Sequence, residues 1–129
     1  MALDVSVALL AGSVGAYLLL SAVGVLSTKD ASEEIIGALR GNRALAHVTG
    51  AVAFFIGGII LLMRPGFGSW LTAMLSATAI WWMVEGALML ASSKLVFSRS
   101  DASGHFRRMN MLAIPLGLAL IAGAALELA

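Results

Sequence analysis

The sequence of 129 residues contains no cysteine and only one tyrosine, and only 12% of its residues are charged. Without cysteine the chain forms no disulfide and no thiolate metal site, and it has no thiol nucleophile. A soluble domain carries about 25% charged residues, so a chain this poor in charge cannot cover itself with a polar surface. These deficits exclude thiol chemistry and argue against a water-soluble fold.

The sequence also lacks the motifs of catalytic and metal sites. It has no HExxH motif, no Gly-rich phosphate loop and no paired carboxylates. A bis-histidine haem needs two axial histidines facing each other within spans, and His105 stands near a helix start beside Arg107 and Arg108. With a net charge of only +1, nothing indicates a nucleic-acid partner. We therefore predict no enzyme activity, no metal, no required cofactor and no nucleic-acid binding.

Hydrophobic residues dominate what is present, at 60% of the chain with a mean hydropathy of +0.99. The few charges are clustered, which leaves four apolar runs of roughly 20 residues or more, each able to cross a hydrocarbon core of about 30 Å. The predicted spans cover residues 5–27, 44–63, 69–93 and 105–128. We predict an all-α integral membrane protein, a four-transmembrane-helix bundle that forms one domain over residues 1–129.

A short helix over about residues 31–40 is predicted after the first span. Asp30 followed by Glu33 is the pattern of a capping box, and Gly41 is a stop signal. Its apolar residues share one side of the helix: Ile35, Ile36 and Leu39. We expect this helix to lie at the membrane interface, with docking to a partner as the alternative.

The placement of basic residues predicts the orientation in the cell (inner) membrane. Seven of the eight lie in or beside the first and third loops: Lys29, Arg40, Arg43, Lys94, Arg99, Arg107 and Arg108. The opposite side, with both termini and the second turn, carries only Arg64. The positive-inside rule then predicts that loops 28–43 and 94–104 are cytoplasmic and that both termini are extracytoplasmic.

The chain also suggests an internal repeat. Shifting the sequence by 65 residues aligns Lys29 with Lys94 and Arg43 with Arg108, so both basic loops begin and end alike. Each half is then a helical hairpin of the same orientation, and the two tandem hairpins would be related by a pseudo-twofold axis along the membrane normal. In this register Glu85 occupies the position of Leu20.

Two motifs resemble a known family. The run from Gly50 to Gly66 and the later pair Glu85-Gly86, followed by Ala87 and Leu88, are similar to the hairpin unit of the HdeD-like small membrane proteins. That unit consists of a helix, a Pro-containing turn, a second helix with an acidic-Gly pair and a basic loop, and the resemblance covers about residues 44–128. The family is linked to acid resistance without an assigned chemistry, so the resemblance implies no catalytic residues.

Glu85 is the one carboxylate well inside an apolar segment, and an ionisable group at that depth is a functional-site hypothesis. The neutral acid is its expected form unless a cation pairs with it. Candidate partners on neighbouring helices are His47, Asn110, Ser21 and Tyr17. His47 is expected to be the more buried of the two histidines. Three roles stay open: a structural hydrogen bond between helices, proton transfer with His47, or a ligand contact.

Trp81 and Trp82 are predicted near mid-membrane, away from the interfacial belt where tryptophan is usually found. Consecutive helical residues point about 100° apart, so at most one of them faces Glu85. The rings could stack a flat apolar ligand such as a quinone or a carotenoid pigment, or they could pack against Gly50 or Gly57. Bound lipid is a further candidate ligand, because Arg99, Arg107 and Arg108 could hold anionic headgroups; the alternative is that they only set the topology.

The expected function follows from small residues and missing reactive groups. Glycine and alanine at helical spacing favour helix–helix packing in lipid. We therefore expect a structural or accessory subunit, or an oligomeric scaffold, whose partners are membrane lipid and other membrane subunits or further copies of itself. The alternative is a small proton-linked transporter, or an acid-stress protein, that uses Glu85 and His47.

Overall fold

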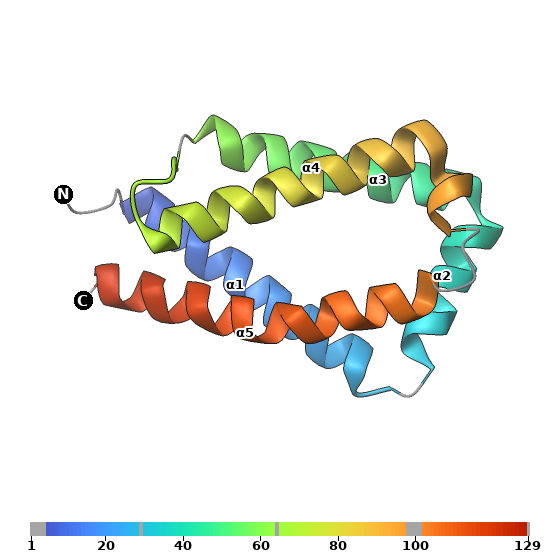
Figure 1. The fold of residues 1–129 in the computed structure, drawn as a ribbon, viewed down its shortest axis with the longest axis horizontal. Coiled ribbons are helices and arrows are strands. Elements are labelled where there is room, and N and C mark those ends of the chain that lie inside the picture. Colours follow the sequence, from blue (N-terminus) through green and yellow to red (C-terminus); the bar gives the residue numbers. More distant parts are fainter. Residues whose placement is uncertain (1–4, 29, 64, 98–101, 129) are drawn as a thin grey trace.

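The computed structural model describes residues 5–28, 30–63, 65–97 and 102–128, and for residues 93–96 it describes the backbone alone. Within these residues all regular structure is helical (Figure 1). The helices are α1 (Val5–Leu26), α2 (Ala31–Gly41), α3 (Arg43–Leu62), α4 (Trp70–Phe97) and α5 (Ala102–Leu128). All except α2 are long and apolar enough to cross a membrane, which is the pattern of a multi-pass membrane protein.

The predicted spans agree with the observed helices except around the third loop. The span within α4 ends at Ser92, where the backbone leaves helical geometry (φ −158°, ψ 58°), but the helix resumes and runs to Phe97. Helix α5 already begins at Ala102. The prediction of a solvated loop over 94–104 is therefore wrong for the described part of that segment, which is helical on both sides. Polar residues fit in this part of the helices because it extends beyond the apolar segment that crosses the membrane.

The four spans associate as two close pairs. Helix α1 packs mainly against α5 and α3 mainly against α4, and contacts between the pairs are much sparser. Figure 1 shows the start of α1 and the end of α5 at the same end of the bundle, with α2 at the other. The close pairs thus differ from the two predicted hairpins, which join α1 to α3 and α4 to α5. Each span packs most closely against a span of the other half of the chain.

Glycines explain this choice of neighbours. In α1 and α5, a Cβ atom at Gly15 would lie 2.7 Å from the carbonyl oxygen of Gly117. In α3 and α4, a Cβ at Gly86 would lie 2.5 Å from the carbonyl oxygen of Gly50. Backbone therefore meets backbone at both crossings, which is possible only without side chains. Such close approach increases the van der Waals contact that drives helix association in lipid.

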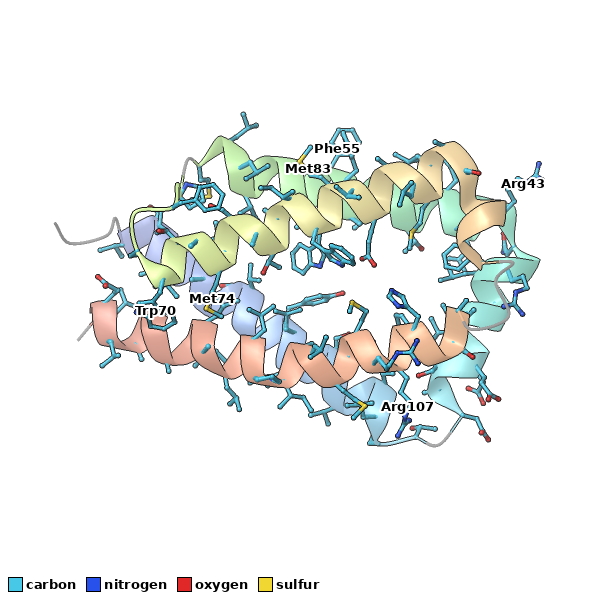
Figure 2. All side chains as sticks on the ribbon, viewed as in Figure 1. Arg43, Phe55, Trp70, Met74, Met83 and Arg107 are labelled. Carbon is cyan, nitrogen blue, oxygen red and sulfur yellow. The ribbon has the colours of Figure 1, made fainter. Side chains whose placement is uncertain are left out.

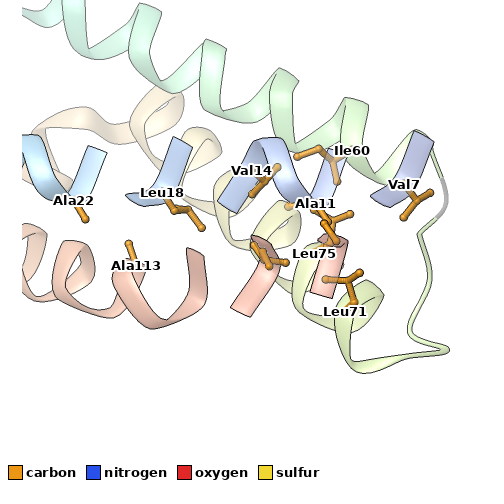
Figure 3. Close-up of a cluster of buried hydrophobic side chains, with 12 residues drawn as sticks. Val7, Ala11, Val14, Leu18, Ala22, Ile60, Leu71, Leu75 and Ala113 are labelled. Carbon is orange, nitrogen blue, oxygen red and sulfur yellow. The ribbon is translucent and has the colours of Figure 1, made fainter. Parts of the chain in front are cut away.

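The main core runs along α1 from Val7 to Ala22 and along the facing part of α5, and its residues from α3 and α4 lie toward the end where α1 begins (Figure 3). It combines side chains of all four spans, among them Val7 and Ala11 of α1, Ile60 of α3, Leu75 of α4 and Leu120 of α5. Ile60, Leu75 and Leu120 are essentially inaccessible. This cluster joins the two pairs at one end of the bundle.

A second cluster closes the opposite end and involves α2. Ile36 and Leu39 are buried against Ala46, Phe97 and Ala102, from α3, α4 and α5. The Arg40 Nε donates a 2.5 Å hydrogen bond to the Phe97 carbonyl oxygen. The expectation that this apolar face rests on the membrane is therefore corrected for Ile36 and Leu39, since the ends of three spans cover them.

The ends of α2 match the predicted residues but not the predicted cap. The helix ends at Gly41, as expected, and Asp30 is its N-cap residue. The Asp30 side chain makes no capping hydrogen bond within the described residues, so the capping box with Glu33 is not formed. The side chain of Asn42 instead caps the next helix, accepting a 3.0 Å hydrogen bond from the Leu45 N–H. The turn between α2 and α3 is thus fixed from the α3 side.

Candidate functional site

The site is centred on Glu85, which lies half-buried in α4. The indole N–H of Trp81, one turn earlier, donates a hydrogen bond to the Glu85 carboxylate. His105 of α5 is the ionisable group of another helix that acts electrostatically on it. A carboxylate and an indole donor therefore lie together on α4, and an imidazole of α5 acts on the carboxylate electrostatically.

The histidine at this site is not the one that the sequence favoured. His47 is exposed near the start of α3, whereas His105 is half-buried. The expectation that His47 is the more buried histidine is therefore wrong. The physical reason is that α5 begins at Ala102, before the predicted start of the span at His105, so His105 lies at the end of the first turn and not at the first residue of the helix.

Tyr17 and Trp82 form the aromatic part of the site. Their ring centroids are 5.7 Å apart and their planes are nearly perpendicular, at 88°. Trp82 packs against the main core, but Tyr17 remains 59% exposed and Trp81 47% exposed. Because Trp82 and Glu85 are three residues apart on one helix, they lie on the same side of α4. Tyr17 therefore reaches the Glu85 side of α4 from α1.

The tryptophans do not fill the glycine positions that the sequence suggested. Gly50 lies against the backbone of Gly86 and the Cβ of Met89, and Gly57 lies against Ala79 and Met83. Packing of the indoles on Gly50 or Gly57 is therefore corrected: these glycines serve the contact between α3 and α4. Trp81 donates to the carboxylate, whereas Trp82 contacts Tyr17 and packs against the main core.

Other predicted residues lie apart from this site. Asn110 is buried, but its amide donates a 2.9 Å hydrogen bond to the Phe106 carbonyl oxygen of its own helix. Arg107 and Arg108 are exposed in α5, and Figure 2 places Arg107 at the end of the bundle near α2. Arg99 lies outside the described residues. The described residues contain no group of three or more potential metal ligands of the His, Asp, Glu and Cys types.

A second feature, which the sequence did not indicate, is an apolar groove on the outer side of α3 and α4. Its volume is about 390 Å³, and Phe55, Ile59 and Leu62 of α3 and Met83 of α4 line it. In Figure 2, Phe55 and Met83 lie on the side of this pair that faces away from α5. The groove is therefore separate from the Glu85 site.

Comparison with known proteins finds no matching family model, no similar curated protein and no similar solved structure. The similarity to HdeD-like proteins therefore stays a prediction from its motifs. Any functional argument starts from the Glu85 site itself.

Proposed function

We propose that this protein binds and releases a proton at Glu85 within the membrane, and that it acts as a small proton-linked transporter or acid-stress protein without catalysis of its own. The observation that carries the proposal is a half-buried carboxylate in the membrane-spanning part of α4, which accepts a hydrogen bond from Trp81 and is acted on electrostatically by His105 of α5. This was the alternative expectation from sequence, with His105 now in the place of His47.

The chemistry favours a proton as the first ligand. A carboxylate inside a membrane span is costly in its charged form, so such residues are rare and mark ion or proton pathways. The Trp81 N–H can donate a hydrogen bond to either form of the acid, and its bond is stronger to the carboxylate. Imidazole is the side chain that most readily exchanges protons near neutral pH, so His105 provides a second proton-binding group across the helix interface.

The packing supports movement around this site. Glycine contacts hold α1 to α5 and α3 to α4, whereas contacts between the pairs are sparse outside the two clusters at the ends. Two tightly packed units joined by few contacts can shift relative to each other, which is one way in which transporters change access to a site. A change of charge on Glu85 alters the electrostatic free energy between α4 and α5.

The proposal includes the orientation and the repeat predicted from sequence. The segments 28–43 and 94–104 face the cytoplasm of a cell with an inner membrane, and both termini face the other side. The first span of each half packs on the second span of the other half, α1 on α5 and α4 on α3. A pseudo-twofold axis between the halves produces this pattern, which supports a duplicated hairpin.

The substitution Glu85→Gln tests the proposed function. In vesicles containing the purified protein and a pH-sensitive dye, we expect the substitution to lower protein-dependent proton uptake by about a hundredfold, because the positioned proton-binding group is lost. The control is Glu127→Gln, which removes an exposed carboxylate near the end of α5 and should leave uptake unchanged. If Glu85→Gln carries protons as fast as the parent chain and only lowers the thermal unfolding temperature, Glu85 has a structural role.

A second candidate function is the scaffold or accessory subunit expected from sequence. Several glycines of the spans make their close contacts inside the chain, at Gly15, Gly50, Gly86 and Gly117. The specific observation in its favour is now the apolar groove of α3 and α4. An apolar surface of this shape in lipid suits the aromatic and aliphatic side chains of the same helix pair in a second copy.

Self-association through the groove is tested with two phenylalanines of equal exposure. Phe55 lines the groove and Phe67 does not, and both are 65% exposed. We expect Phe55→Ala to lower the dimer fraction in mild detergent several-fold, because truncating a central aromatic residue costs about 1–2 kcal/mol of association free energy. Cross-linking followed by gel electrophoresis measures that fraction. Equal effects of Phe55→Ala and Phe67→Ala, or a monomeric parent chain, contradict the scaffold proposal.

A further inference from the structure

We infer that the Glu85 site binds a lipophilic organic cation, of the quaternary ammonium or phosphonium class, in competition with the proton. The inference extends the proposed function, because the cation can bind only when Glu85 has released its proton. It names the chemical class of ligand that the aromatic residues around the carboxylate would bind.

The carboxylate supplies the charge that such a cation requires. Trp81 donates one hydrogen bond to Glu85, and a carboxylate has about four acceptor positions. A quaternary cation has no hydrogen to donate and therefore does not compete with the indole for its acceptor. It needs only an opposite charge in a region of low dielectric constant, where the attraction between the two charges is much stronger than in water.

The aromatic rings supply the second requirement. Tyr17 and Trp82 meet edge to face at 88°, so their planes form a corner, and Trp81 lies beside the carboxylate. The chain leaves Tyr17 and Trp81 about half exposed, so ring surface remains free for a ligand. A cation over an aromatic face is attracted by about 0.5–2 kcal/mol per ring, and recognition of quaternary ammonium groups uses several such rings together.

Small inorganic cations fit the site less well. Calcium and magnesium take six or more oxygen ligands, whereas Glu85 is the carboxylate in the membrane-spanning part of α4. Among the described residues no cluster of three potential ligands occurs anywhere. A site with one negative charge and three aromatic rings is therefore suited to a single diffuse positive charge that carries apolar groups.

Surrounding groups determine how binding depends on pH. Each helix packed on α4 near Glu85 presents different groups: α5 presents His105, α1 presents Tyr17, and α3 presents Gly50 and Phe54 against Gly86. The nearby end of α2 packs through Ile36 and Leu39. Protonation of Glu85 removes the attracting charge, so cation binding weakens on acidification.

Tetraphenylphosphonium is a suitable probe for the purified full-length protein in mild detergent. We expect saturable binding that quenches tryptophan fluorescence and weakens as the pH falls. Glu85→Gln should weaken it by more than about tenfold, and Trp81→Leu by roughly 3- to 30-fold through loss of one cation–π contact. The matched control is Trp70→Leu, since Trp70 is similarly exposed but stands at the first residue of α4. Triphenylphosphine oxide, which is uncharged, should bind at least tenfold more weakly.

The outcomes separate this inference from the proposed function. Equal binding by the parent chain and Glu85→Gln, or by the charged and uncharged probes, overturns the cation site even if proton uptake depends on Glu85. Binding of tetraphenylphosphonium without Glu85-dependent proton uptake keeps the cation site and overturns proton transport. If Glu85→Gln fails to fold, the comparison of Trp81→Leu with Trp70→Leu decides, and equal affinities of these two variants reject the site.

Discussion

Replacing Gly57 by alanine is expected to destabilise the protein by about 1–3 kcal/mol, while alanine at the adjacent Gly58 is expected to be neutral or slightly stabilising. A Cβ atom at Gly57 would lie 2.5 Å from the Ala79 carbonyl oxygen and 2.7 Å from Cγ of Met83. The first of these is backbone and cannot rotate away, so α3 and α4 must separate. At Gly58 the nearest atom is the flexible Met83 Cε at 3.9 Å, an ordinary contact distance.

The two variants form a closely matched pair. Both add one methyl group to α3, and both gain the same helix propensity of about 1 kcal/mol relative to glycine. The difference between them therefore isolates the contact between α3 and α4. Thermal unfolding in detergent, followed by circular dichroism, measures it as a difference in midpoint temperature. Equal midpoints for the two variants would falsify the backbone contact between α3 and α4 at Gly57.

The same contact explains which part of the fold could be predicted from sequence. The spans followed from the length and hydropathy of the apolar runs, since the bilayer imposes both. The glycines of the second predicted span, Gly50, Gly57 and Gly58, indicated close helix contacts, and short distances confirm this at Gly50 and Gly57 but not at Gly58. Their partner helix could not be predicted, because any glycine-bearing surface in lipid can accept another, and only the whole set of crossings selects α4 for α3.

The candidate site, too, could be predicted from sequence only in part. Glu85 stood out because a carboxylate in an apolar run has few explanations. Its histidine was misassigned, since the fourth span was predicted to begin only at His105, and His47 was expected to be the more buried histidine. Polar sequence at a membrane boundary is compatible with both a loop and a helix end, and the contacts of Phe97 and Ala102 with α2 favour helix here. The Tyr17–Trp82 contact depends on the tertiary arrangement of α1 and α4 and has no signal in either segment alone.

Alanine at Gly15 or Gly117 is expected to destabilise the pair of α1 and α5 by about 1–3 kcal/mol each, with a double variant that is less destabilised than the sum. A Cβ at Gly15 would lie 2.7 Å from the Gly117 carbonyl oxygen, and one at Gly117 would lie 2.8 Å from that of Gly15. The methyl group added at either position would thus clash with the backbone at the other position. Once the first alanine has separated the helices, the second meets less resistance.

The unfolding free energies of the parent, both single variants and the double variant give the coupling directly. We expect a coupling of about 0.5–3 kcal/mol, the range for residues in contact. Gly24→Ala is the control on the same helix, because a Cβ there meets nothing within 4 Å. Additive effects of Gly15→Ala and Gly117→Ala mean that each alanine is accommodated separately, and they contradict a shared crossing.

The crossing also connects helix packing to the Glu85 site. Tyr17 follows Gly15 by two residues on α1, so a displacement of α1 from α5 also changes the contact between Tyr17 and Trp82 on α4. We therefore expect Gly15→Ala to shift tryptophan emission and to weaken tetraphenylphosphonium binding, whereas Gly24→Ala should change neither. If Gly15→Ala destabilises the protein but leaves the emission spectrum unchanged, the packing of α1 on α5 does not affect the site. A joint change supports a site whose aromatic corner depends on the glycine contact between α1 and α5.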